Sequence, residues 1–131
     1  MRRVRSRPVF LTLWQLHFPW SALASITHRL SGLYMAISIP VLISIFASSV
    51  STAYAFEEIV VQLRKPSFIF FFCWSFGMAL IYHLYAGIRH LLMDINLFKS
   101  KEWAQRSALI LFGIYAVKSS MFSLWLMGVI S

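Results

Sequence analysis

The chain has little charge and almost no cysteine. Only 12% of its 131 residues are charged, while 60% are hydrophobic, and its mean hydropathy is +0.74. A soluble domain of this size could not cover so much apolar surface, so we expect an integral membrane protein. The single cysteine, Cys73, excludes an intrachain disulfide and a cysteine-based metal cluster within this chain.

Three long apolar runs account for most of the sequence. Their length and lack of charge predict membrane-spanning helices at about 21–49, 67–93 and 107–130. The remaining segments are a basic arm at 1–20 and a short connection at 50–66. Too little sequence lies outside the runs for a second domain, so we expect one all-α membrane-anchor domain over residues 1–131.

Most basic residues lie in the segments between and before the apolar runs. A net charge of +8 would suggest nucleic acid for a soluble protein, but these residues lie at the ends and loops of spanning segments, which argues against a nucleic-acid partner. The arm and the loop at 93–106 together hold Arg2, Arg3, Arg5, Arg7, Lys99, Lys101 and Arg106. By the positive-inside rule, both face the cytoplasm, or the matrix of a mitochondrion.

The second run contains a polar stripe. His83, Gly87, His90 and Asp94 are spaced by four, three and four residues, so they share one face of a helix. Gly87 leaves room for a flat group against the helix, and an imidazole within a spanning helix is a common axial ligand of haem iron. A hydrogen bond from His83 to a neighbouring helix is the alternative. His90 and Asp94 could equally be interfacial anchors, as could Arg89.

A second polar stripe lies early in the first run. Ser25, His28, Arg29 and Gly32 share a helical face, again with a glycine that permits close approach. The alternative is that the Ser25 hydroxyl has no functional role within the helix and that the Arg29 side chain extends to the membrane surface. Because the first helix starts on the basic side and the second ends there, we expect the two stripes to meet at one membrane depth. Lys118, near mid-membrane in the third run, has no evident role.

The two stripes together resemble a known pair of signatures. Residues 25–32 (SITHRLSG) and 83–94 (HLYAGIRHLLMD) are similar to the paired motifs of the cytochrome b subunit of succinate dehydrogenase, the membrane anchor of respiratory complex II. The resemblance extends to Arg7-Pro8 and Phe18-Pro19, to the three-helix layout and to the overall length. The form of the N-terminal part is more similar to proteobacterial anchors than to animal mitochondrial ones.

For the haem, the resemblance implies one half of a heterodimeric haem-binding helix bundle. His83 matches the axial ligand of haem b, and the second axial histidine would come from another hydrophobic anchor subunit. His28, Arg29 and His90 would lie on the propionate side. A haem held between His28 and His83 of this one chain is the internal alternative.

For the quinone, the resemblance implies that Ser25 and Arg29 line a ubiquinone pocket with Phe18 and Ile26 as apolar walls. Quinone reduction takes two electrons and two protons, so a hydroxyl that donates to a quinone carbonyl and a cation that stabilises developing negative charge suit the chemistry. Succinate oxidation, FAD and the iron–sulfur clusters would belong to a flavoprotein subunit and an iron–sulfur subunit. The chain alone should not be catalytic.

Two further alternatives remain. The chain could be the anchor of a fumarate reductase or another quinone-linked dehydrogenase, because the sequence of an anchor subunit does not indicate the direction of the reaction. It could also be a non-redox assembly or transport subunit, which would bind no haem. For the succinate dehydrogenase anchor, we expect a multi-pass protein of the bacterial inner membrane with a cytoplasmic N-terminus. The mitochondrial inner membrane is the alternative location.

Overall fold

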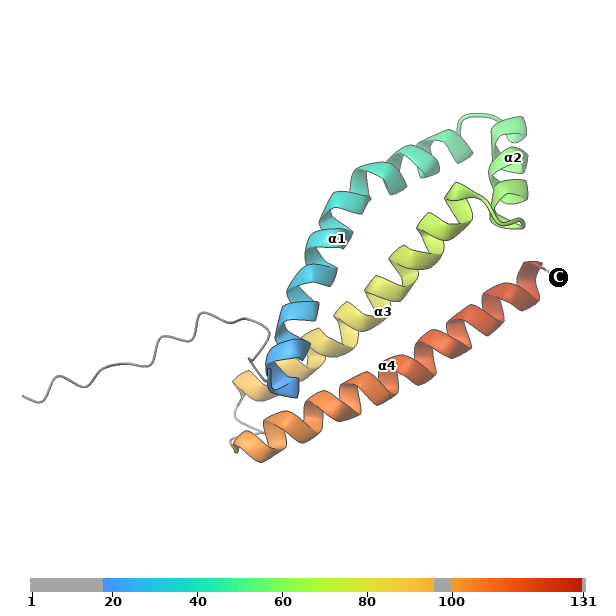
Figure 1. The fold of residues 1–131 in the computed structure, drawn as a ribbon. Helices are drawn as coiled ribbons and strands as arrows, with labels where there is room; N and C mark the ends of the chain where they lie inside the picture. Colours follow the sequence, from blue (N-terminus) through green and yellow to red (C-terminus); the bar gives the residue numbers. More distant parts are fainter. Residues whose placement is uncertain (1–17, 96–99, 131) are drawn as a thin grey trace, which may run out of the picture.

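A computed structural model describes residues 18–95 and 100–130. Within these residues the chain forms four α-helices: α1 (Trp20–Ser49), α2 (Ala53–Leu63), α3 (Phe68–Asp94) and α4 (Lys101–Ile130). Helices α1, α3 and α4 are long and apolar enough to cross a membrane. They run side by side, with α2 placed across the end where α1 stops and α3 starts (Figure 1). The predicted all-α fold with three spanning helices is therefore confirmed.

The boundaries of the spanning helices follow the apolar runs closely, with one exception. Helices α1 and α3 start and end within one residue of the predicted bounds, whereas α4 starts at Lys101 rather than at about 107. The first turns of α4 are polar, so an apolar criterion does not detect them. Ser100 starts this helix, since its hydroxyl accepts a hydrogen bond from the backbone amide of Trp103 at 3.2 Å. The basic arm, residues 1–17, lies outside the described residues.

The connection predicted at 50–66 contains a helix of its own, α2. Thr52 caps its start, because the threonine hydroxyl accepts a hydrogen bond from the amide of Ala55 at 3.0 Å. Ser67 links its end to the next helix: the hydroxyl donates to the carbonyl oxygen of Gln62 at 2.7 Å and accepts from the amide of Phe70 at 3.1 Å. Glu57 and Glu58 are exposed on α2. The connection between the first two spanning helices is therefore largely helical, a feature that the sequence analysis did not predict.

The spanning helices pack through small residues at one junction. Ala24 of α1, Ala86 of α3 and Ala108 of α4 are at most 2% exposed, and small side chains allow helix backbones to approach closely in membranes. Tyr82 joins all three helices, since its hydroxyl donates to the carbonyl oxygen of Ala24 at 3.1 Å and its ring packs on Tyr115 at 5.1 Å. This junction places the polar face of α3 against α1.

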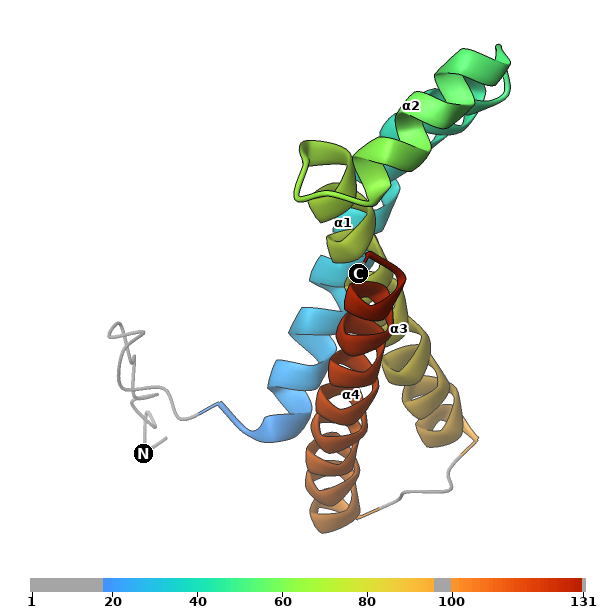
Figure 2. The same cartoon turned by 90° about the vertical axis from the view of Figure 1, so that its right-hand side faces the viewer.

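The remaining apolar side chains point outward. Leu33, Ile37 and Phe46 on α1 are 59%, 68% and 68% exposed, as expected for a surface that meets lipid or another hydrophobic subunit. Helix α1 bends along its length, and Pro40 lies within it (Figure 1). The turned view shows the ends of α1, α3 and α4 opposite α2 spread apart from one another (Figure 2). Both polar stripes lie toward that end of the bundle.

Candidate functional site

Three histidines meet between α1 and α3. The ring of His28 on α1 stacks on the ring of His83 on α3, with centroids 4.2 Å apart and planes 23° apart. The ring of His90, two turns further along α3, lies 5.3 Å from His28. All three side chains are half-buried. The prediction that the two polar stripes meet is confirmed by these contacts.

Glycines on both helices make room for these rings. A Cβ atom added at Gly32 would lie 2.9 Å from Cε1 of His83, and one added at Gly87 would lie 3.5 Å from Nε2 of His28. Each glycine therefore accepts the imidazole of the opposite helix. The space beside Gly87, which we expected to accommodate a flat ligand, is occupied by the His28 side chain.

The Nδ1 atom of His83 is held by α1. It lies 3.1 Å from Oγ of Ser31 and 3.3 Å from the backbone carbonyl oxygen of His28. The Ser31 hydroxyl itself donates to that same carbonyl oxygen at 2.7 Å. Ser31 lies inside the first signature, but we predicted no role for it. Its position next to Gly32 and one turn beyond His28 is the signal that could have identified it.

The Nε2 atom of His28 is buried and makes no hydrogen bond within the described residues. A buried polar atom without a partner costs on the order of 1–3 kcal/mol, so native structures rarely leave one unpaired. The described part of the chain holds no group of three or more His, Cys, Asp or Glu side chains arranged to bind a metal ion. The cluster therefore has a polar atom without a partner, but it is not a metal-ion site of its own.

The residues predicted for the quinone lie at the start of α1: Ser25, Ile26 and Arg29 are on its first turns, and Phe18 comes just before it. Ser25 is half-buried, Arg29 is exposed, and Phe18 and Ile26 are 51% and 44% exposed. Ser25 and Arg29 are one turn apart on one helix face. Among the described residues, neither side chain has a hydrogen-bond partner. Three of the four side chains, those of Phe18, Ile26 and Arg29, are thus exposed on the described part of the chain, and Ser25 is half-buried beside them.

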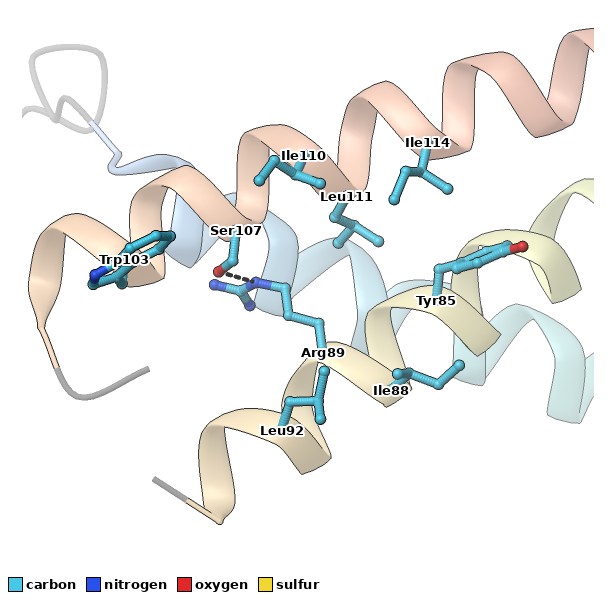
Figure 3. A pocket seen from close by; sticks show the side chains of 9 residues that line it. All are labelled: Tyr85, Ile88, Arg89, Leu92, Trp103, Ser107, Ile110, Leu111 and Ile114. Atoms are coloured by element: carbon cyan, nitrogen blue, oxygen red, sulfur yellow. Dashed lines mark hydrogen bonds between the residues drawn. The ribbon is translucent and has the colours of Figure 1, made fainter. Parts of the chain in front are cut away.

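Arg89 has a different place from the one expected. It is only 6% exposed, and its guanidinium donates to Oγ of Ser107 at 3.0 Å and to the carbonyl oxygen of Ala104 at 2.7 Å. Arg89 therefore links α3 to α4 and is not an exposed interfacial anchor. The side chain of Asp94 is exposed. Figure 3 shows the Arg89 side chain reaching from α3 to Ser107 on α4, with Trp103 to one side of this contact.

An apolar cavity of about 210 Å³ lies beside Arg89, lined by Ile88, Leu92, Ile110 and Ile114 among others (Figure 3). It lies between α3 and α4, whereas the histidines lie between α3 and α1. Because the two sites use different faces of α3, this cavity does not belong to the histidine cluster. Lys118 is exposed on α4, and its role stays open.

The sequence was compared with known proteins. A model of the family described as succinate dehydrogenase/fumarate reductase transmembrane subunit matches residues 3–122. The chain belongs to this family. It is 31% identical over 120 residues to the succinate dehydrogenase cytochrome b556 subunit of Coxiella burnetii, covering 92% of this chain and 96% of that protein. It is 30% identical over 100 residues to the succinate dehydrogenase cytochrome b560 subunit of Cyanidium caldarium, covering 69% and 71%.

Membership of this family confirms the resemblance that we inferred from residues 25–32 and 83–94. The matched region includes the whole of α1, α2 and α3 and most of α4. The protein is thus a multi-pass membrane subunit of the succinate dehydrogenase and fumarate reductase type. The non-redox alternative, an assembly or transport subunit, has no support from these comparisons.

Proposed function

We propose that this chain is the cytochrome b anchor of a succinate:ubiquinone oxidoreductase and that His83 is an axial ligand of its haem b. The observation that supports this most directly is the environment of the His83 ring. Its Nδ1 atom is engaged by Ser31 and by the carbonyl oxygen of His28, which leaves Nε2 as the nitrogen available to iron. Histidines that ligate metals commonly have their other ring nitrogen held in this way.

The neighbouring histidines suit the propionate side of a haem. His28 carries the unpaired, buried Nε2 atom, which could donate to a carboxylate oxygen. His90 lies beside it, and the exposed Arg29 adds a positive charge on the next residue of α1. A haem bound here would supply one-electron redox chemistry. The residues of this chain would hold it, orient its ligand and balance its charge.

The second axial ligand would come from another hydrophobic subunit. A haem held by both His28 and His83 would need space between the two rings. The rings of His28 and His83 are instead stacked face to face, which argues against a haem held by these two residues. The broad exposed apolar surface of α1 fits a helical partner that would complete the bundle.

For the quinone site we propose that Ser25 donates a hydrogen bond to a ubiquinone carbonyl and that Arg29 stabilises negative charge as the ring is reduced. Both are present on one helix face next to the histidine cluster, and a guanidinium remains protonated at working pH. Phe18 and Ile26 would cover the ring. Because Arg29, Phe18 and Ile26 are exposed in this chain, the iron–sulfur subunit and the second anchor would close the pocket.

The flavoprotein and iron–sulfur subunits would carry FAD, the iron–sulfur clusters and succinate oxidation. We place the complex in a bacterial inner membrane, with the N-terminus in the cytoplasm and the mitochondrial inner membrane as the alternative. The basic residues Lys101 and Arg106 at the start of α4 lie at the bundle end from which α1 starts (Figure 1), which supports this orientation. A fumarate reductase anchor is the second candidate, because the matching family includes both enzymes.

The proposal is tested by purifying the complex through a tag on this chain. A low-spin b-type spectrum together with co-purifying flavin and iron–sulfur subunits is expected. A preparation with neither haem nor dehydrogenase subunits would overturn it. Succinate-driven quinone reduction, compared with quinol-driven fumarate reduction in the same preparation, then separates the two candidates.

A further inference from the structure

Ser31 stands at the centre of a three-atom network that fixes the His83 ring. Its Oγ lies 2.7 Å from the carbonyl oxygen of His28 and 3.1 Å from Nδ1 of His83. The same carbonyl oxygen lies 3.3 Å from that Nδ1. The Nδ1 atom therefore faces two oxygens on one turn of α1.

The proton count in this network determines the tautomer of His83. A serine hydroxyl has one proton, and the Ser31 hydroxyl directs it to the carbonyl oxygen of His28. Toward His83 it can only accept, and a carbonyl oxygen can also only accept. Nδ1 must then carry the proton, and in a neutral imidazole the lone pair lies on Nε2.

The position of the ring is restricted on two further sides. One face stacks on His28, and Cε1 lies against Gly32, where even a Cβ atom would come within 2.9 Å. Stacking and steric contact limit where the ring can lie, but they do not distinguish Nδ1 from Nε2. Only the hydrogen bonds of Ser31 and the His28 carbonyl do so.

We propose that Ser31 is a positioning residue for the haem ligand: with the His28 carbonyl oxygen it holds His83 as the Nδ1–H tautomer and directs Nε2 to the iron. This inference rests on the proposed function, because it assigns a role toward the haem. A hydrogen bond from Nδ1–H to an acceptor makes the imidazole a more basic ligand, which favours the oxidised iron. Loss of the Ser31 acceptor should therefore raise the haem midpoint potential and weaken haem retention about tenfold.

Three variants of the assembled complex test this. Ser31→Ala removes the hydroxyl. Ser31→Thr keeps it, and the added methyl group has room because Ser31 lines a cavity of about 270 Å³. Ser44→Ala is the matched control, since the exposed Ser44 on the same helix also donates to a backbone carbonyl, that of Pro40 at 2.9 Å, but contacts no other helix through its hydroxyl.

The readouts are a potentiometric titration of the haem absorbance, the low-temperature electron paramagnetic resonance spectrum of the ferric haem, and the haem-to-flavin ratio. We expect Ser31→Ala to raise the midpoint potential, shift the resonance positions and lower the ratio, while Ser31→Thr and Ser44→Ala match the unchanged complex. Unchanged potential and resonance positions in Ser31→Ala would overturn the inference.

Two outcomes separate this inference from the proposed function. If the unchanged complex holds no haem, or if His83→Ala keeps a normal haem, the proposed function fails and the inference fails with it. If His83→Ala disturbs the haem but Ser31→Ala does not, only the inference fails.

If the Ser31→Ala complex does not assemble, Ser31→Cys is the substitute, because a thiol is a weak acceptor. We expect Ser31→Cys to shift the haem midpoint potential in the same direction. An unchanged potential would overturn the inference.

Discussion

The imidazole rings of His28 and His83 stack 4.2 Å apart and join the first spanning helix to the second. The contact is possible because each ring lies against a glycine of the opposite helix, His83 at Gly32 and His28 at Gly87. Two histidines, two glycines and one serine thus form a single packed unit. Changes to its small residues, and not only to its histidines, should therefore affect the proposed haem site.

Gly32→Ala should disturb the haem. The new Cβ would lie 2.9 Å from Cε1 of His83, and the ring cannot move aside without losing its hydrogen bonds and its stack. We expect haem retention to fall on the order of tenfold, as for other losses of ligand-orienting contacts. The haem-to-flavin ratio measures it. Gly113→Ala is the control, because nothing lies within 4 Å of a Cβ added there; equal haem loss in both variants would contradict the account.

Arg89→Ala should destabilise the packing of α3 on α4. The guanidinium donates one hydrogen bond to Ser107 and one to the Ala104 carbonyl oxygen, and hydrogen bonds from charged groups contribute about 1.5–3 kcal/mol each. We expect a loss of at least about 2 kcal/mol, seen as a lower thermal unfolding temperature of the detergent-solubilised complex. The control is Arg106→Ala, since Arg106 is exposed. A melting temperature unaffected by Arg89→Ala would refute the structural role of this residue.

Tyr34 and Ser75 should be coupled in stability. Their hydroxyl groups are 2.6 Å apart across the α1–α3 interface. Hydrogen bonds between membrane helices average about 0.6 kcal/mol in double-mutant cycles. We expect a coupling free energy of about that size from Tyr34→Phe, Ser75→Ala and the double variant, measured by unfolding of the complex in mixed micelles. Strict additivity of the two single changes would show that the contact contributes nothing.

Ser25→Ala and Arg29→Leu should impair quinone reduction selectively. Loss of the serine hydroxyl removes one hydrogen bond of about 1 kcal/mol, equivalent to roughly a fivefold decrease in rate. Loss of the Arg29 cation removes stabilisation of the negative charge on the quinone, which is expected to lower the rate of quinone reduction by about 10²–10³-fold. The ratio of succinate–quinone to succinate–dye activity measures the effect, because the dye accepts electrons before the quinone site. Normal ratios in both variants would remove the quinone assignment.

The spanning helices could be predicted because a bilayer requires a long apolar run, and that requirement is visible in composition alone. Helix α2 could not, since it is short and is held by single side-chain hydrogen bonds, of Thr52 at its start and of Ser67 to the Gln62 carbonyl oxygen near its end. The first turns of α4 were missed because they are polar. The predicted span marks only the part of the helix whose composition suits the hydrocarbon.

The site shows the same division. Helical periodicity predicted which residues share a face, and the contact of the two stripes followed from topology. Periodicity does not specify partners on other helices: it did not indicate that Arg89 points to α4, that the His28 ring fills the space beside Gly87, or that Ser31 reaches His83. The position of His83 within a spanning helix suggested a haem ligand, and the resemblance strengthened that prediction. The roles of Ser25 and Arg29 came from the resemblance, and all three roles stay predictions.

The central claim, that His83 ligates a haem, is tested most directly by the reduced-minus-oxidised visible spectrum of the purified complex with and without His83→Ala. His90→Ala is the control, because His90 lies in the same cluster but is not assigned to the iron. The account predicts a low-spin b-type signal that is lost or strongly altered in His83→Ala and kept in His90→Ala. An unaltered signal in His83→Ala, in a complex with its full set of subunits, would contradict it.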